Sequence, residues 1–222
     1  MVVAIDGPSG AGKSTVARLL AGRLGFLYVD TGAMYRAVAL KAKRAGLDLR
    51  DEHGMGELCR FLEIDFLRDE EGIRVICSGE DVTDLIRSPS ISLLASEISR
   101  ISAVRQSLAE LQRGFGRRGG VVLEGRDIGT VVFPEADVKF FLDADPSVRA
   151  RRRYEELKAR GEDVELEETI REMERRDYND RTRALAPLRA APDAVLIDST
   201  HLSVDEVVEM MADIFREKAE KR

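Results

Sequence analysis

Residues 7–14 (GPSGAGKS) fit the phosphate-binding pattern G-x-x-x-x-G-K-[ST] without a mismatch. The glycines permit backbone conformations and a close approach that a Cβ would obstruct, so successive N–H groups can point at an anion. Lys13 adds a positive charge, and Ser14, at the start of a following helix, offers its hydroxyl to Mg²⁺. The pattern predicts a nucleoside triphosphate site, whose contacts we expect to be Gly7, Pro8, Ser9, Gly10, Ala11, Gly12, Lys13, Ser14 and Thr15.

The segments around this loop match the strand and helix that a phosphate loop needs. Residues 2–5 (VVAI) are apolar and mostly β-branched, and apolar residues recur at helical spacing over residues 16–24, before Gly25. A glycine-rich turn without chemical function is therefore the weaker interpretation.

Composition indicates a soluble globular protein. The 222 residues are 44% apolar and 34% charged, with a net charge of −6. Even the Arg-rich residues 149–183 balance eleven positive against eleven negative side chains, so we expect no nucleic-acid surface. The two cysteines lack C-x-x-C spacing and the two histidines lie far apart, so we expect neither a disulfide nor a zinc site. The sequence shows no signal or membrane segment, which predicts a cytoplasmic protein without membrane contact. We expect a monomer.

Apolar strands and helices alternate along the chain. Besides residues 2–5, buried strands are predicted at residues 26–29, 121–123, 138–142 and 194–197. Helices are predicted at about residues 33–45, 89–100 and 103–113, and a last helix begins at the capping box 203–206, with Val207, Val208, Met211 and Ile214 facing inward. This alternation favours an α/β fold of the P-loop NTPase type, in three layers with a five-stranded parallel sheet.

Two stretches interrupt the alternation. Residues 64–68 and 73–77 alternate apolar and polar side chains around a turn at 69–72, which predicts an inserted antiparallel hairpin. Two Arg-rich helical stretches, separated by residues 159–163, predict a helical hairpin that could move as a lid.

Polar residues follow the predicted strands, where an open α/β sheet binds its ligands. A carboxylate directly after a strand and beside a phosphate loop commonly orients Mg²⁺, so Glu124, and after it Asp30, is a metal candidate besides Ser14. The lid arginines could stabilise a transferring phosphoryl group and exclude water, although a solvated helix face with ion pairs is the alternative for about half of them. They are Arg149, Arg151, Arg152, Arg153, Arg176, Arg181 and Arg183.

Several motifs together resemble the bacterial cytidylate kinase family. They are residues 5–13 (IDGPSGAGK), 30–36 (DTGAMYR), 125–134 (GRDIGTVVFP), 176–181 (RDYNDR), 184–188 (ALAPL) and 198–200 (DST), which span nearly the whole chain. The resemblance implies ATP and Mg²⁺ as cofactors and the phosphorylation of CMP and dCMP to CDP and dCDP by direct in-line transfer. It also implies a single kinase unit with a core of residues 1–30, 115–148 and 190–222, an insertion for monophosphate binding at about 31–114 and a lid at about 149–185.

The same resemblance implies residue roles. Arg36 and Arg126 would hold the acceptor phosphate, and Ser96, Arg105 and Asp127 would read the cytosine. Arg176, Asp180 and Arg183 would contact the sugar or the phosphates, Thr31 and Tyr35 would complete the acceptor set, and Lys13, Arg126, Arg181 and Arg183 would be catalytic. Thr31 stands where the family often has Ser, and Glu124 where it often has Asp, so each position keeps its functional group.

Cytosine chemistry independently favours Asp127 and Arg105. The base offers an amino donor at N4 and acceptors at N3 and O2, to which a carboxylate and a guanidinium are complementary. Uracil would instead place its O4 lone pairs against the carboxylate. The alternative role for Asp127 is to cap the turn after the strand at 121–123.

Two other functional classes stay open. A kinase for UMP, shikimate or gluconate would share the phosphate loop and the sheet. A GTPase-type switch is disfavoured, because no [NT]-K-x-D tetrapeptide occurs.

Overall fold

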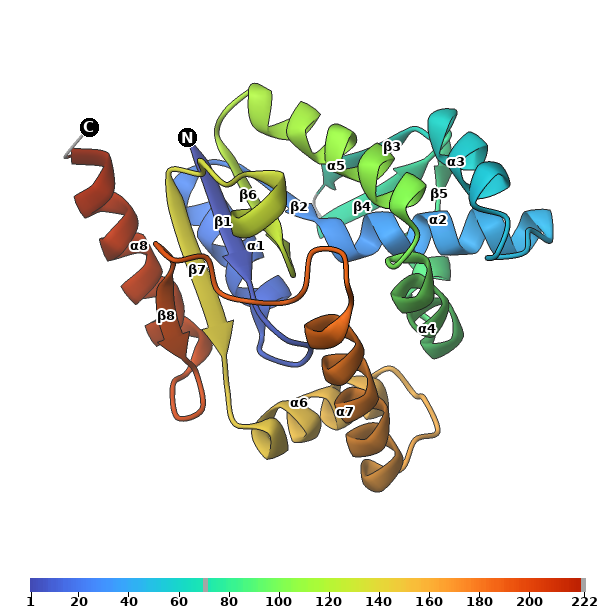
Figure 1. Cartoon of the computed structure of the whole chain (residues 1–222). Coiled ribbons are helices and arrows are strands. Elements are labelled where there is room, and N and C mark those ends of the chain that lie inside the picture. The colour runs from blue at the N-terminus through green and yellow to red at the C-terminus, as the bar shows by residue number, and fades with distance from the viewer. Residues whose placement is uncertain (70–71, 221–222) are drawn as a thin grey trace. The chain divides into compact units, whose positions relative to one another are not determined.

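The computed structural model describes residues 1–69 and 72–220 (Figure 1). The chain forms two compact units, one of Met1–Tyr28 with Gly119–Arg222 and the other of Val29–Arg118. The finer division into core, insertion and lid stays a prediction. Among the described residues, no helix is long and apolar enough to cross a membrane.

The first unit is built on a five-stranded sheet in the order β2-β6-β1-β7-β8 (Figure 1). Parallel pairing joins β1 to both β6 and β7, and β7 to β8. The predicted strands are all present, which confirms the parallel α/β fold. They are β1 (Val2–Asp6), β2 (Leu27–Asp30), β6 (Val121–Gly125), β7 (Val138–Asp143) and β8 (Val195–Asp198).

The expectation that all five strands are buried is wrong for β8. This strand lies at the edge of the sheet, where the Leu196 side chain is 69% exposed. The central strands β1 and β6 are buried along nearly their whole length because they have neighbours on both sides. The core of the unit therefore lies under these strands and not under the edge.

Two helices of the first unit pack against each other on the sheet. They are α1 (Lys13–Leu24), which ends at the left-handed Gly25, and α8 (Val204–Glu220). The predicted capping box of α8 is confirmed, since Glu206 accepts from the Ser203 N–H at 2.8 Å. Phe215 is buried on the inner face of α8, whereas Ile214, predicted there, is only half-buried.

The predicted helical hairpin is also confirmed (Figure 1). It consists of α6 (Pro146–Ala159), capped by Asp145, and α7 (Leu166–Thr182). A single π-helical turn, η2 (Ile128–Val132), follows β6. It begins directly after Arg126 and Asp127, so its geometry decides where these two residues lie.

The second unit contains helices and a three-stranded antiparallel sheet. Helix α2 (Thr31–Ala45) begins two residues before the predicted start, because the Asp30 side chain caps it by accepting from the Ala33 N–H. Residues 70 and 71 of the predicted turn lie outside the described residues. The other elements are β3 (Ile64–Asp69), β4 (Gly72–Cys77), β5 (Glu80–Asp81), η1 (Leu85–Arg87), α4 (Pro89–Ile98) and α5 (Ser102–Arg117).

One helix of this unit was missed by the sequence patterns. Helix α3 (Glu52–Arg60) contains Gly54 and Gly56, each of which disfavours a helix by about 1 kcal/mol relative to Ala. Met55 and Cys59 are nevertheless buried, and α3 packs on α5. Tertiary packing thus outweighs the poor local propensity. The two-residue strand β5 was also missed, and α5 extends four residues beyond its predicted end.

Candidate active site

The phosphate loop adopts the backbone that its glycines predict. Gly7, Gly10 and Gly12 all have positive φ, at 152°, 73° and 89°. A Cβ on Gly7 would lie 2.0 Å from the Leu142 carbonyl oxygen, and a Cβ on Gly10 would lie 2.6 Å from that of Arg149. Larger residues are therefore excluded at these two positions by the backbone behind the loop.

Lys13 lies at the first position of α1 and is 5% exposed. Its ammonium group donates to the Pro8 carbonyl oxygen at 2.6 Å, which folds the side chain back over the loop. Burial, followed by the positive charge of Arg126, lowers its pKa to about 7, against the opposing influence of Glu124. The loop therefore holds a cation that added negative charge would stabilise.

A cluster of arginines and acids lies between the end of β6 and the end of α7 in the same unit. Arg126 donates from Nε to Asp180 at 2.9 Å, and Arg183 lies 3.8 Å from the other oxygen of Asp180. Arg183 also donates to the Ala186 carbonyl oxygen. Burial favours protonation of Asp180, but Arg126, Arg176 and Arg183 outweigh it and lower the pKa of Asp180 below its ordinary value.

Asp127 is buried beside this cluster, 3.6 Å from the Arg183 guanidinium. Its side chain makes no capping hydrogen bond to η2, although its backbone carbonyl accepts from Val131 and Val132. Arg126, Asp127, Asp180 and Arg183 are thus brought together.

Glu124, the predicted metal-side carboxylate, is buried at the end of β6 and accepts a hydrogen bond from the Tyr28 hydroxyl at 2.6 Å. Ser14 and Thr15 are exposed at the start of α1. The described residues hold no group of three or more His, Cys, Asp or Glu that could bind a metal by itself. An exposed hydroxyl at the start of α1 and one buried carboxylate at the end of β6 fit an Mg²⁺ ion that is held mainly by nucleotide phosphates and water, as this ion usually is.

The second unit carries the remaining predicted acceptor residues. Arg36 reaches back over the first turn of α2 and pairs with Asp30 at 2.9 Å. Gly32 leaves room for this, because a Cβ there would lie 3.2 Å from the guanidinium. Asp30, the second metal candidate, thus uses its two oxygens for the helix cap and for Arg36. Thr31 is buried beside them.

Ser99 connects the predicted base-reading residues of this unit. Its hydroxyl donates to the Ser96 carbonyl oxygen at 2.7 Å, and its own carbonyl accepts from Arg105 at 3.1 Å. The Arg105 guanidinium also lies over the Tyr35 ring, 5.9 Å from its centre. The structure therefore joins Ser96 to Arg105 through Ser99, which the sequence patterns did not indicate, and places Arg105 over Tyr35.

The lid arginines divide into two groups. Arg149 is buried and joins the hairpin to the phosphate loop, since one guanidinium nitrogen contacts the Ser9 carbonyl oxygen at 2.9 Å and Asp177 at 2.7 Å. Arg152 donates to Ser199, after β8. Arg151 and Arg153 pair with glutamates of their own helix, as the solvated-face alternative anticipates. Arg176 is half-buried and Arg181 is exposed.

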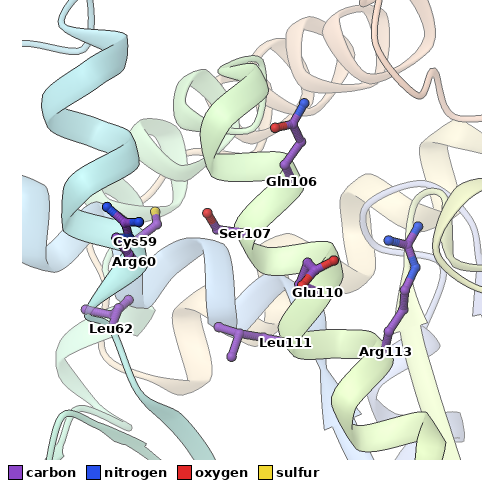
Figure 2. A pocket seen from close by; sticks show the side chains of 8 residues that line it. All are labelled: Cys59, Arg60, Leu62, Gln106, Ser107, Glu110, Leu111 and Arg113. Carbon is purple, nitrogen blue, oxygen red and sulfur yellow. The ribbon is translucent and has the colours of Figure 1, made fainter.

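A shallow hollow of about 540 Å³ lies between α3 and α5 (Figure 2). Its side chains include Arg60, Glu110 and Arg113, and it contains none of the predicted site residues. The candidate site is therefore defined by the phosphate loop and the charged clusters, and not by this hollow.

Comparisons with known proteins identify the family of the chain. The family model described as cytidylate kinase matches residues 3–217. The chain belongs to the cytidylate kinase family. It is 58% identical over 218 residues to the cytidylate kinase of Geobacter sulfurreducens, covering 98% of this chain and 94% of the relative. The cytidylate kinase of Carboxydothermus hydrogenoformans is 50% identical over 218 residues, with 98% of each chain covered.

Solved structures with low sequence identity share the fold. A gluconokinase from Sinorhizobium meliloti aligns with a TM-score of 0.50 at 15% identity, covering 99% of this chain and 94% of that one. An uncharacterized protein from Eubacterium ventriosum aligns with a TM-score of 0.52 at 12% identity, covering 98% of each chain. At such identities the likeness extends to the fold alone, so it does not favour gluconate as an acceptor.

Proposed function

We propose that this member of the cytidylate kinase family transfers the γ-phosphoryl group of ATP to CMP and dCMP. The observation that carries the proposal is the first unit's combination of a phosphate loop with the buried cluster of Arg126, Asp127, Asp180 and Arg183. In-line phosphoryl transfer needs positioning and charge stabilisation more than a protein nucleophile. The loop amides and Lys13 would position and stabilise the phosphates of ATP, and the arginines of the cluster would do the same for the transferring group and the acceptor.

Each residue then has a definite task. The loop amides and Lys13 bind the β- and γ-phosphates, and Arg183 and Arg181 stabilise the transferring group. Arg36 and Arg126 bind the acceptor phosphate. Mg²⁺, held by Ser14 and by Glu124 through water, would neutralise phosphate charge. A monomeric state and a cytoplasmic location stay predictions.

The acceptor base is assigned to Asp127, Arg105 and Ser96. Asp127 is buried, so its carboxylate would meet the base in a desolvated place where a mismatched hydrogen bond is costly. The N4 amino group of cytosine satisfies a carboxylate, whereas O4 of uracil does not. Arg105 is held by Ser99 and Tyr35 and would serve N3 and O2.

An acceptor panel tests the proposal directly. ATP is incubated with CMP, dCMP, UMP, shikimate or gluconate, and ADP and the phosphorylated product are both measured. We expect CMP and dCMP to be preferred. Preferred phosphorylation of UMP, shikimate or gluconate would replace the proposal with that kinase, and nucleotide hydrolysis without any phosphorylated acceptor would support a switch protein.

Asp127→Asn tests the assignment of the base. The amide can face O4, so kcat/KM for CMP should fall by roughly 30- to 150-fold, which corresponds to about 2–3 kcal/mol, and the UMP:CMP ratio should rise. The variant loses the negative charge that faces Arg183 but keeps one side-chain oxygen at position 127, so we expect the free energy of unfolding to fall by only about 1–2 kcal/mol. Glu209→Gln, the same change of group in the exposed pair with Arg23, is the control and should leave the ratio unchanged. An equal loss on both acceptors with a large loss of stability would make Asp127 structural.

A further inference from the structure

Asp6 is a buried acid at the end of β1 with two backbone partners far away in sequence. It is 3% exposed. Its Oδ1 accepts from the Ile128 N–H at 2.8 Å, and its Oδ2 accepts from the Gly129 N–H at 2.7 Å. Both carboxyl oxygens of Asp6 are thus engaged by the backbone of the segment that follows Asp127.

The backbone of Asp6 lies beside the other end of the same segment. In the parallel pairing of β1 with β6, Asp6 is the register partner of Gly125. Its side chain holds residues 128 and 129. Arg126 and Asp127 lie between Gly125 and these two amides, so a single residue of β1 is next to both ends of the segment that carries them.

Asp6 is also directly joined to the phosphate loop, which begins at Gly7. The loop passes close to β7 at this point, since a Cβ on Gly7 would lie 2.0 Å from the Leu142 carbonyl oxygen. One covalent step therefore separates a loop that closely approaches β7 from the residue whose side chain accepts from the amides following Asp127.

Burying a carboxylate in this way carries a free-energy cost. Burial raises the pKa of Asp6 to about 7, although the two amides counteract it. The amides of residues 128 and 129 open η2, where the first N–H groups of a helical turn lack an acceptor within the turn. The carboxylate satisfies them, and in doing so it determines the position of η2 relative to β1.

We infer that Asp6 is a positioning residue for phosphoryl transfer, which holds Arg126 and Asp127 at a fixed distance from the phosphate loop. The inference rests on the proposed function, because it assigns Asp6 its role through Arg126 and Asp127. A residue that only stabilises the fold would lower the amount of active enzyme. A positioning residue also changes how the enzyme uses its acceptor.

Asp6→Asn is the test, because it keeps the shape of the side chain but turns one acceptor into a donor that faces a backbone N–H. We expect the kcat/KM for CMP to fall at least tenfold, the KM for CMP to rise more than the KM for ATP, and the UMP:CMP ratio to rise. Val3→Ala, a core truncation in the same strand, is the control. It should lower stability but leave the UMP:CMP ratio and the two KM values unchanged.

Gly129→Ala perturbs the same attachment from its other end and covers the case in which Asp6→Asn does not fold. Its Cβ would lie 3.2 Å from Lys139 Cδ, a flexible side chain, and 3.4 Å from Asp6 Oδ2. We expect a smaller change of the UMP:CMP ratio in the same direction. The inference is overturned if the folded variants keep the wild-type ratio and KM values, or if Gly129→Ala alone folds and keeps them. If wild-type enzyme does not phosphorylate CMP, the proposed function itself fails, which is a separate outcome.

Discussion

Lys13→Met should make the nucleotide-free protein more stable while abolishing phosphoryl transfer. The buried ammonium has its pKa lowered from 10.5 to about 7, first by burial and then by Arg126. At about 1.4 kcal/mol per pKa unit, this corresponds to an upper limit of roughly 5 kcal/mol against the charged form in the folded protein. The hydrogen bond to Pro8 is lost in the variant and offsets about 1–3 kcal/mol. A net gain of about 2–4 kcal/mol is therefore expected at pH 6.

The sign of the pH dependence follows from the same pKa. Unfolded protein keeps Lys13 protonated up to about pH 10.5, whereas the folded protein releases this proton near pH 7. Between these values the folded state binds fewer protons, so the wild type gains stability as the pH rises. The stability difference between Lys13→Met and the wild type should thus be largest at pH 6 and shrink toward pH 9.

Thermal and urea unfolding of both proteins at pH 6 and pH 9, without nucleotide, measure this difference. A gain of this size raises the Tm by about 4–16 °C in a protein of this length. Lys139→Met is the matched control, because Lys139 is buried but paired with Asp193 at 2.8 Å, and its loss should destabilise the protein at both pH values. A Lys13→Met variant that is destabilised equally at pH 6 and pH 9, like this control, would refute the reasoning. So would retention of near-normal turnover with Mg-ATP.

Two further predictions concern the helical hairpin. Arg149→Lys keeps the charge but loses the guanidinium nitrogen that contacts both Ser9 and Asp177, so we expect the KM for ATP to rise about tenfold and the free energy of unfolding to fall by about 1–3 kcal/mol. Arg151→Lys, at an exposed pair, is the control, and equal effects of the two variants would contradict the role of Arg149. Deleting residues 160–163 should raise ATP hydrolysis relative to CDP formation, because closure of a lid excludes water; an unchanged ratio of ADP to CDP would remove the hairpin from the mechanism.

Local patterns in the sequence were sufficient for the elements that carry the phosphate loop. The loop, its strand and its helix are contiguous, and glycine has few alternatives at Gly7 and Gly10, where backbone atoms lie within 2.6 Å of a Cβ position. The same patterns failed for α3, where two glycines hide a helix that packing maintains. They also overestimated the burial of β8, since a sequence run does not reveal whether a strand lies at the edge of the sheet.

The partners of the charged residues could not be predicted in the same way. Asp6 accepts hydrogen bonds from Ile128 and Gly129, which are separated from it by 122 and 123 positions in the sequence. Arg149 donates a hydrogen bond to Ser9 across a separation of 140 positions. Such contacts depend on how β1, β6 and β7 align, and the side-chain types alone leave many pairings open. The composition indicated that arginines and acids are balanced in number, but it did not show which arginines are buried. Arg149 and Arg151, two positions apart on α6, differ completely in burial.

The buried arginines of the first unit explain why acids accompany them. A guanidinium removed from water without a partner would be strongly unfavourable, so Arg126 and Arg183 share Asp180, and Arg183 also lies near Asp127. Lys13 is less well compensated by nearby carboxylates, and its lowered pKa reflects the free-energy cost of burying its charge. Added phosphate groups would lower that cost, because the charges of Glu124 and Asp180 do not outweigh burial and Arg126 at Lys13. The chain thus stabilises Arg126 and Arg183 with its own carboxylates, whereas the proposed function leaves further stabilisation of Lys13 to the phosphates of the nucleotide.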